Sequence, residues 1–264
     1  MNGLIRAEWY KLRHSKLFYI LLIVIACAAA FFVGVVGFLD SNPMAQGEAV
    51  AVGDVFAFPA AGQSGVFLLG ELSVMISICL AAFIGLFIAN DFKTGTIRHA
   101  LALGKKRTAV FFSKLFSAGV ATLAFLLTAT IVSTVGLTLL FDFGTLPFPE
   151  YLIQLFSTLS LQLLLHFTYA VLFCLIAFLS RNTGQTIFTG IGYVLVSSVL
   201  LSILGSFDTF GSVAKILPQY YAAALGNFPD EMTSLTVGAI TVSVVYSVAA
   251  IWVGNSMFKK VDVK

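Results

Sequence analysis

The sequence predicts an all-α membrane protein with six transmembrane helices and both termini in the cytosol. Its composition indicates the membrane class, because 59% of the 264 residues are apolar and 10% are charged. Soluble domains have about 45–50% apolar and about 25% charged residues. The lengths of the apolar stretches and the distribution of the charges supply the helix count and the orientation. We expect the whole chain, residues 1–264, to fold as a single transmembrane domain.

Six apolar stretches are each long enough to cross a bilayer. A helix rises about 1.5 Å per residue, so about 20 residues cross a hydrocarbon core of about 30 Å. The predicted spans are residues 17–39, 67–89, 115–140, 155–179, 186–204 and 235–257. The first stretch follows basic residues, as an export signal would, but its 23 residues exceed the apolar core of about 7 to 15 residues in a signal. We therefore expect it to remain in the protein as a helix.

Lys and Arg collect on one side of these spans. Of the 15 basic residues, 14 lie in the segments that face one side, and only Lys215 lies opposite. Nine of the 12 acidic residues face the other side, so the exceptions on the basic side are Glu8, Asp91 and Asp262. Basic residues that flank spanning helices stay in the cytoplasm, which places both termini there.

The segment 3–16 predicts an amphipathic helix ahead of the first span. Leu4, Trp9 and Leu12 can share one apolar stripe, while Lys11 lies away from it. Such a helix would lie in the lipid headgroup plane with Trp9 at the interface. A solvated cytosolic leader is the alternative.

The cytosolic connection 91–114 predicts a short helix between the second and third spans. Gly95 breaks the preceding helix, and Thr96 would cap the short one. Gly104 would end it, and Thr108 would cap the next span.

The short helix would carry an apolar face that no other segment of the sequence evidently covers. Ile97, Ala100 and Leu101 share that face, with Arg98 between them. The helix would therefore lie on the membrane surface, as a polybasic lipid-binding loop does, or dock on a partner protein. The residues predicted to take part in docking are Gly95, Thr96, Ile97, Arg98, Leu101, Lys105, Lys106 and Arg107.

Two long connections are predicted on the outer side, residues 40–66 and 205–234. The second is too apolar for a solvated loop, and its stretch 213–225 could form a short helix broken near Pro218. We expect this helix at the outer membrane interface, because irregular backbone at membrane depth must be buried against protein or line water. The connection 141–150 would be a turn.

Within the predicted spans the ionisable residues are Glu71 and His166. An ionisable group inside a membrane is a candidate for a transport path. A neutral His can instead hydrogen-bond a neighbouring helix, and Gln162, one turn away, fits either a substrate path or a polar packing stripe. Glu71 lies near the outer end of its span, where a role at the solvent or lipid headgroups is the alternative.

Several activities are excluded by motif. The sequence has no phosphate-binding loop of the form G-x-x-x-x-G-K followed by Ser or Thr, so this chain would not hydrolyse ATP. It has no H-E-x-x-H or G-x-S-x-G motif, so no catalytic residues are predicted. Its three cysteines all lie inside predicted spans, which favours packing roles over a disulfide or metal site. A secondary transporter or channel remains the alternative to an ATP-driven transporter.

Three groups of residues resemble the permease subunit of type-two ATP-binding-cassette (ABC) exporters. The groups are Glu8, Lys11, Leu12 and Ser15; Gly95-Thr96-Ile97-Arg98 with Arg107 and Lys114; and Phe258-Lys259-Lys260-Val261-Asp262. The resemblance covers the full length and is closest to small six-span permeases of Firmicutes that export, or confer immunity to, peptide antibiotics such as bacitracin and lantibiotics.

This resemblance implies the partners and the place of the protein. The segment 3–16 would be the connecting, or elbow, helix, with Glu8, Trp9 and Lys11 in it. The helix in 91–114 would be the coupling helix that sits in a groove of a cytosolic ATPase, which would hold ATP and Mg²⁺ while this chain binds no cofactor. A second permease, identical or different, would complete the pathway in the bacterial cytoplasmic membrane, among membrane lipids and without nucleic acid. The cargo would be an amphipathic peptide, lipid or drug.

Overall fold

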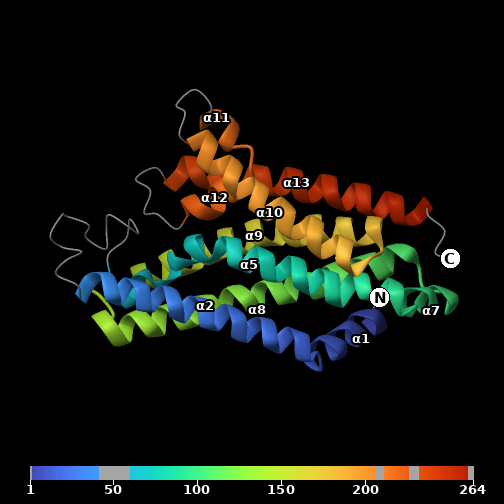
Figure 1. Cartoon of the computed structure of the whole chain (residues 1–264), viewed down its shortest axis with the longest axis horizontal. Helices are drawn as coiled ribbons and strands as arrows, with labels where there is room; N and C mark the ends of the chain where they lie inside the picture. The colour runs from blue at the N-terminus through green and yellow to red at the C-terminus, as the bar shows by residue number, and fades with distance from the viewer. Residues whose placement is uncertain (1, 42–59, 206–210, 226–231, 261–264) are drawn as a thin grey trace.

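The computed structural model describes residues 2–41, 60–205, 211–225 and 232–260, and all regular secondary structure in these ranges is helical. Six of the described helices are long and apolar enough to cross a membrane. Figure 1 shows them as one elongated bundle, with α1, α7 and the C-terminal part of α13 at the same end. The basic segments lie at that end, so we call it the cytosolic end. The predicted fold class is confirmed.

The observed helices extend beyond the predicted spans. The spanning helices are α2 (Lys16–Ser41), α5 (Leu68–Ile84) with its continuations η2 (Gly85–Ala89) and α6 (Asn90–Lys93), α8 (Arg107–Phe141), α9 (Phe148–Ser180), α10 (Thr183–Gly205) and α13 (Met232–Lys260). The largest differences are that α8 begins at Arg107 rather than Leu115, and α9 at Phe148 rather than Leu155. An apolar stretch measures the hydrocarbon thickness, whereas helical hydrogen bonds continue into the polar layers on either side.

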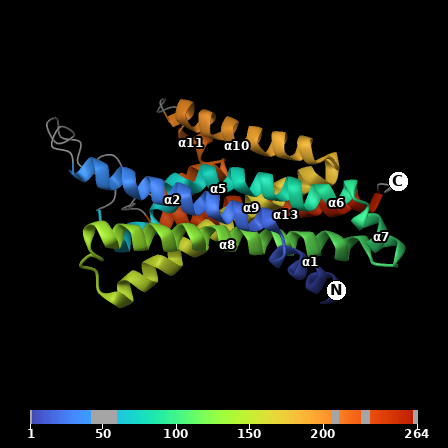
Figure 2. The same ribbon diagram turned by 60° about the horizontal axis from the view of Figure 1, so that its bottom comes forward.

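Helix α5 forms the centre of the bundle. In its most apolar stretch 72% of the residues are buried, against 17% for α10. It packs against α2, α8, α9 and α10, and Figure 2 shows α10 as the outermost of these helices. Because α5 is central, a movement of its cytosolic end would displace the helices that pack against it.

Small residues permit the closest contacts between helices, as is common in membranes. The short 3₁₀ helix η1 (Gly62–Val66) lies against α8, where a Cβ on Gly65 would meet the backbone nitrogen of Thr134 at 2.5 Å. A Cβ on Gly190 of α10 would meet the Ala81 side chain of α5 at 2.8 Å.

The outer connection contains two short helices, α11 (Gly211–Ala214) and α12 (Pro218–Ala224), separated near Pro218 as predicted. Pro218 is the first residue of α12, where its missing N–H is of no consequence. Helix α12 packs against α5, α9 and α13 with Gln219 and Ala222 buried, and its expected position at the outer interface stays a prediction. Contact with protein satisfies the condition under which a short helix can enter the membrane.

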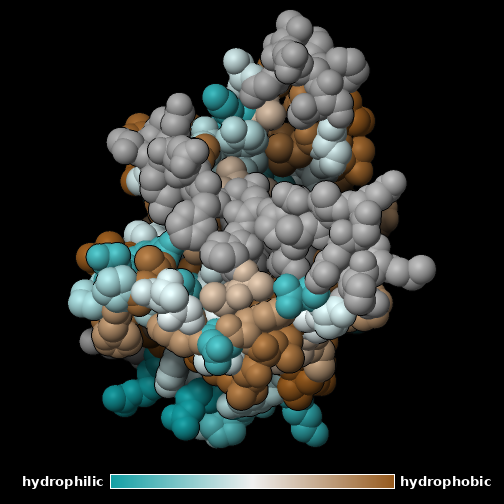
Figure 3. Space-filling model, turned by 90° about the vertical axis from the view of Figure 1, so that its left-hand side faces the viewer, coloured by the Kyte–Doolittle hydropathy of each residue, from teal (hydrophilic) through white to brown (hydrophobic). Residues whose placement is uncertain are grey.

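Apolar side chains cover much of the outside of the bundle. Figure 3 looks onto the end opposite α7 and shows brown hydrophobic areas among white and teal residues. Leu139 of α8 is 81% exposed and Phe188 of α10 is 82% exposed, as a lipid-facing surface requires. Val261 and Asp262 of the C-terminal motif lie outside the described residues.

Candidate functional site

The cytosolic end is organised by residues 94–106, here called the connector, which join α6 to α8 and contain α7 (Thr96–Ala102). Gly95 separates α6 from α7 and has φ +74°. Only glycine adopts this left-handed conformation at no steric cost, so the helix break predicted at Gly95 is confirmed. The chain can therefore leave α6 and start a new helix in a different direction within one residue.

Gly104 ends α7 in a Schellman motif. Its φ is +76°, its N–H donates to the carbonyl of Leu101 at 2.9 Å, and the N–H of Lys105 donates to the carbonyl of Ala100 at 3.2 Å. These two bonds satisfy carbonyls that the end of a helix leaves without partners. The predicted stop at Gly104 is confirmed, and α7 is closed at both ends by left-handed glycines.

The predicted threonine caps are wrong. Gly95 holds the N-cap position of α7, since its carbonyl accepts the first helical bond from the His99 N–H at 2.9 Å. Thr96 is therefore the first residue of the helix. Similarly, Lys106 is the N-cap of α8, and Thr108 lies inside that helix. In both cases the chain has completed its turn before it reaches the threonine.

Helix α7 has a buried face and an exposed face. Ile97 is 1% exposed and belongs to the main hydrophobic core, and Ala100 and Leu101 pack partly buried against it. The bundle therefore covers the face that the sequence left without a cover, and this expectation is corrected. The outer side of the connector presents Leu103, which is 66% exposed. The exposed polar residues around it are Arg98, His99, Lys105 and Lys106.

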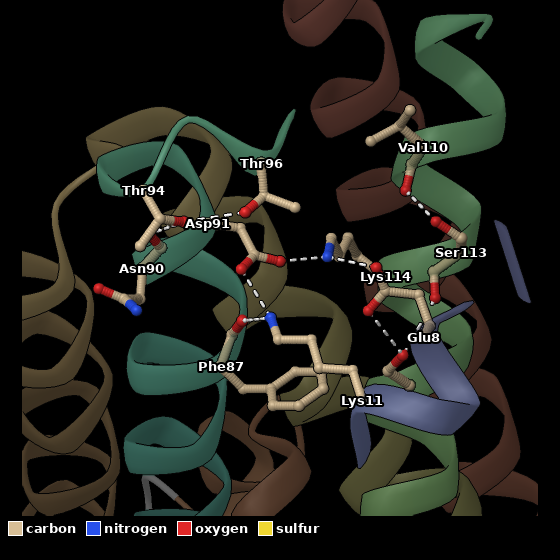
Figure 4. A network of polar contacts seen from close by, with 11 residues as sticks. Glu8, Lys11, Phe87, Asn90, Asp91, Thr94, Thr96, Val110, Ser113 and Lys114 are labelled. Carbon is tan, nitrogen blue, oxygen red and sulfur yellow. Dashed lines mark hydrogen bonds and ion pairs between the residues drawn. The ribbon is translucent and has the colours of Figure 1, made fainter. Parts of the chain in front are cut away.

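Below the connector lies a group of four charged side chains, here called the ion cluster: Glu8 and Lys11 of α1 (Asn2–Arg13), Asp91 of α6 and Lys114 of α8 (Figure 4). Three of the four are buried, and the Lys11 side chain is partly exposed. Lys11 Nζ lies 2.6 Å from Asp91 Oδ1, and Lys114 Nζ lies 2.5 Å from Glu8 Oε1. Lys114 also pairs with Asp91 Oδ2, so Asp91 bridges the two lysines. Lys114 is 2% exposed, Asp91 3% and Glu8 8%. The cluster thus joins three elements that are far apart in the sequence.

Neutral groups complete the coordination of the cluster. The Ser117 hydroxyl donates to Glu8 Oε2 at 3.3 Å. Lys11 Nζ donates to the carbonyl of Phe87 at 3.0 Å and lies 4.1 Å from the centre of the Phe87 ring. Phe87 belongs to η2, a single π-helical turn, and such turns are frequent where helices carry functional contacts. The irregular end of α5 therefore serves as part of the binding site for Lys11.

The ion cluster contains two positive and two negative groups and is balanced in charge. Burial is the main cause that lowers the pKa of Lys11, and the charge of Lys114 lowers it further. The carboxylate of Asp91 opposes both effects through its charge and its hydrogen bond. Because a buried ion left without its partner is strongly unfavourable, each charge depends on the others.

The face that α1 turns to the bundle includes the ion cluster. Glu8 and Leu12 are one helical turn apart, Lys11 lies beside them, and Leu12 is 2% exposed. Trp9 is 44% exposed and lies off this face. A helix within 3–16 is confirmed, as α1 over Asn2–Arg13. Its buried side includes the charged Glu8, to which the sequence analysis gave no buried position.

Sequence reasoning did not find the ion cluster, and it counted Lys114 among the basic residues around the connector. A signal was present, because Glu8 and Asp91 are two of only three acidic residues on the basic side of the chain. Isolated acids among cytosolic lysines are candidates for buried partners. The pairing itself depends on α1 crossing α8, which no local pattern predicts.

A second attachment joins the start of α8, directly after the connector, to the last span. Arg107 Nη1 donates to the carbonyl of Phe258 in α13 at 2.9 Å, and the guanidinium lies 5.9 Å from the Phe258 ring. The Phe258 ring packs edge-on against Phe178 of α9, with their centres 4.8 Å apart. Arg107 was predicted to take part in docking, and the structure shows it in contact with this chain's own α13.

His166 and Gln162 lie together on α9, and both are fully buried. The ring nitrogen Nδ1 of His166 is 2.9 Å from the carbonyl of Gln162, and Gln162 Nε2 donates to the carbonyl of Ala222 in α12 at 2.8 Å. Such contacts are typical of polar residues that hold helices together. Glu71 is exposed in the first turn of α5. The substrate-path hypothesis for these residues stays a prediction.

The sequence analysis missed the other polar residues that hold α12. The Tyr169 hydroxyl donates to Gln219 Oε1 at 2.7 Å, and Gln219 Nε2 donates to Ser73 Oγ at 3.1 Å. Gln219 is therefore hydrogen-bonded to both α9 and α5. The glutamine within the largely apolar stretch 213–225 was the signal that could have indicated it.

Comparison with known families identifies the kind of protein. A family model described as ABC-2 family transporter protein matches residues 4–197, which is more than half of the chain. The chain belongs to the ABC-2 transporter family. No curated protein matches it. The matched region runs from α1 into α10 and includes the connector and the ion cluster.

Membership in the ABC-2 family assigns the chain its part in the transporter. It is the membrane-spanning, non-catalytic permease, and an ABC-2 permease works with an ABC ATPase. The resemblance stated from the sequence is confirmed at the level of this family.

Proposed function

We propose that this ABC-2 permease exports an amphipathic molecule, such as a peptide antibiotic, a lipid or a drug, in a complex with a cytosolic ATPase and a second permease. The ATPase would bind ATP and Mg²⁺ and would contact the connector. Closure of two ATPase subunits would then move α7, and the helices attached to it would follow.

The observation that carries this proposal is that, within the described residues, α7 is attached to the bundle through its inner side, whereas its outer side is exposed. Ile97 fixes it in the core, the ion cluster ties the flanking helices α6 and α8 to α1, and Arg107 ties α8 to α13. A force on the outer face would therefore displace several helices together. Packed helices of this kind shift between discrete arrangements, which is what alternating access requires.

The outer face of the connector has the composition of a docking surface. Leu103 is a large exposed apolar side chain, and the basic Arg98, Lys105 and Lys106 surround it. An apolar anchor inside a charged rim is the usual organisation of a protein interface. A partner groove with an apolar pocket and acidic margins would be complementary to it.

Two adjoining grooves on α9 support an amphipathic cargo. One, of about 610 Å³, lies between α8 and α9 and has apolar walls that include Phe116 and Phe167. The other, of about 660 Å³, lies nearer the outer end and includes Glu150 and Gln154. Ser160 lines both grooves. Apolar and polar parts of one ligand could thus be accommodated along the same helix.

Charge reversal tests the docking role. The double variant Arg98→Glu/Lys105→Glu should reduce copurification of the ATPase from a strain that expresses both genes. The matched control, Arg13→Glu/Lys16→Glu, reverses two exposed cytosolic charges outside the connector and should copurify as the wild type does. Unchanged ATPase recovery and transport with the connector variant would refute the proposal.

Transport of the cargo needs its own assay. Coexpression of the permease and its ATPase in a susceptible host should raise the inhibitory concentration of a peptide antibiotic, and an ATPase variant unable to hydrolyse ATP should abolish the effect. Protection that persists with the inactive ATPase would contradict ATP-driven export. Translocation of labelled lipid without any antibiotic protection would assign the cargo to lipids.

A further inference from the structure

The two adjoining grooves on α9, of about 660 Å³ and about 610 Å³, share Ser160 and are here called together the α9 groove. Glu150 lies at its outer end, and Phe167 lies beyond the midpoint of α9. These two residues are 17 positions apart, which corresponds to about 25 Å along a helix. An elongated ligand would therefore fill both parts.

The two parts of the α9 groove differ in chemistry. The inner part lies between α8 and α9, and Ser160 is the polar residue among the described residues that line it. The outer part adds the polar side chains of Glu150, Gln154 and Ser157 on the same helix. Such a groove suits a ligand with an apolar tail and a polar head, with the head at the end opposite the connector.

The carboxylate of Glu150 supplies the charge of the outer part. Glu150 is exposed, and within the described part of the chain its carboxylate has neither an ion pair nor a hydrogen bond. No Lys or Arg is among the described residues that line either part of the groove. A carboxylate in the first turn of a helix also stabilises the helix N-terminus, so Glu150 alone does not define a site.

Oxygen atoms further along α9 supply the second feature. Gln154 Oε1 is buried and has no hydrogen-bond partner among the described residues. An acceptor left unpaired in this way is unfavourable, and a donor from a ligand would relieve the cost.

The serine hydroxyls of the groove are also acceptors toward a ligand. The hydroxyl of Ser157 donates to the carbonyl of Gln154 at 3.0 Å, and that of Ser160 donates to the carbonyl of Ser157 at 3.1 Å. Because these protons are used within α9, the two oxygens offer lone pairs. A carboxylate followed by acceptor oxygens along one wall favours a ligand that carries a positive charge and N–H donors.

We propose that the α9 groove binds a cargo whose head is a protonated amine and whose tail is one long apolar chain, with the amine at Glu150 and Gln154. A protonated primary amine combines one positive charge with three N–H donors, as this lining requires. The tail would follow the apolar walls toward Phe167. This inference names the chemical class of the cargo and rests on the proposed export function.

Binding can be measured on the purified full-length permease in phosphatidylcholine nanodiscs without the ATPase, with empty nanodiscs as the background. Hexadecylamine, hexadecyltrimethylammonium and palmitate have tails of similar length and differ in the head. Competition against a fluorescent alkylamine should rank hexadecylamine as the tightest ligand and palmitate as the weakest. The quaternary ammonium should fall between them, because it has the charge but no N–H donor.

Variants of two outer acids locate the binding site. Glu150→Gln should weaken hexadecylamine binding by about fivefold, the factor that corresponds to about 1 kcal/mol for an exposed ion pair. Glu150→Lys should reverse the preference, so that palmitate binds more tightly than hexadecylamine. The matched control Asp142→Asn removes an exposed acid that does not line the groove and should bind within about twofold of the wild type. Asn tolerates the left-handed backbone that Asp142 adopts at φ +67°.

Each alternative has its own result. Equal binding of the three ligands by the wild-type protein would overturn the proposal without reference to any variant. Equal losses in Glu150→Gln and Asp142→Asn would indicate diffuse attraction to the outer acids and would also overturn it. Displacement of hexadecylamine by phosphatidylethanolamine in the nanodisc would assign the groove to a membrane lipid instead of a cargo.

Failure of this inference is distinguishable from failure of the proposed function, because binding is measured on the permease alone. Selective binding of hexadecylamine, together with antibiotic protection that persists with the inactive ATPase, would contradict ATP-driven export and leave the groove with its amine ligand. ATP-driven export without any preference for hexadecylamine would support the proposed function and overturn the inference.

Discussion

Replacing Lys114 by Met tests whether the ion cluster holds the cytosolic end together. Met has a similar length and no charge, so the change removes the cation between Glu8 and Asp91 with little loss of volume. Lys11 then faces two buried carboxylates alone. Removing one partner of a buried ion pair costs about 3–5 kcal/mol, because the remaining charge is left without compensation.

Thermal unfolding of the detergent-purified protein measures this cost. One kcal/mol shifts Tm by about 2–4 °C in chains of about this size, so Lys114→Met should lower Tm by about 6–20 °C. Arg13→Met is the matched control, since Arg13 is exposed on α1. A surface substitution of this kind changes stability by about 0.5 kcal/mol or less, and Tm should move by about 2 °C or less.

A compensating variant separates charge balance from packing. Lys114→Met/Glu8→Gln leaves the Lys11–Asp91 pair, which is neutral as a unit and is joined at 2.6 Å. The double variant should recover a large part of the stability lost in Lys114→Met. A Tm for Lys114→Met equal to that of Arg13→Met would refute the reasoning. Further destabilisation on adding Glu8→Gln would show that packing, rather than balanced charge, is the main contribution.

Two glycine substitutions test the backbone and the packing of the bundle. Gly104→Ala should destabilise the protein by about 1 kcal/mol because an L-residue is strained at φ +76°. The control Gly34→Ala lies at a helical site with no heavy atom within 4 Å of the added Cβ and should not lower Tm. Equal effects of the two substitutions on Tm would contradict the strain argument. Gly65→Ala places a Cβ 2.5 Å from the backbone nitrogen of Thr134 and should cost about 1–3 kcal/mol by overpacking. An unchanged Tm for Gly65→Ala would mean that η1 can move away from α8 without loss.

The membrane topology was predictable because its causes are local. Hydrocarbon thickness fixes the length of an apolar stretch. The orientation that the basic residues indicate stays a prediction. The breaks at Gly95 and Gly104 were predictable for the same reason, since a left-handed turn requires glycine whatever surrounds it. The ends of α8 and α9 were less accurate because helices continue beyond the hydrocarbon core that their hydropathy measures.

The sequence by itself determined the six apolar helices and the short helix between the second and third of them. Only the tertiary structure decided which charges are exposed and which are buried. Lys114 and Lys105 are both basic residues near the connector, yet Lys114 is 2% exposed and paired, while Lys105 is on the outer surface. The difference arises because α1 crosses α8 and brings Glu8 to Lys114 from 106 residues away. Whether a buried charge is tolerated depends on the partner that reaches it, and that partner is supplied by the packing of the helices.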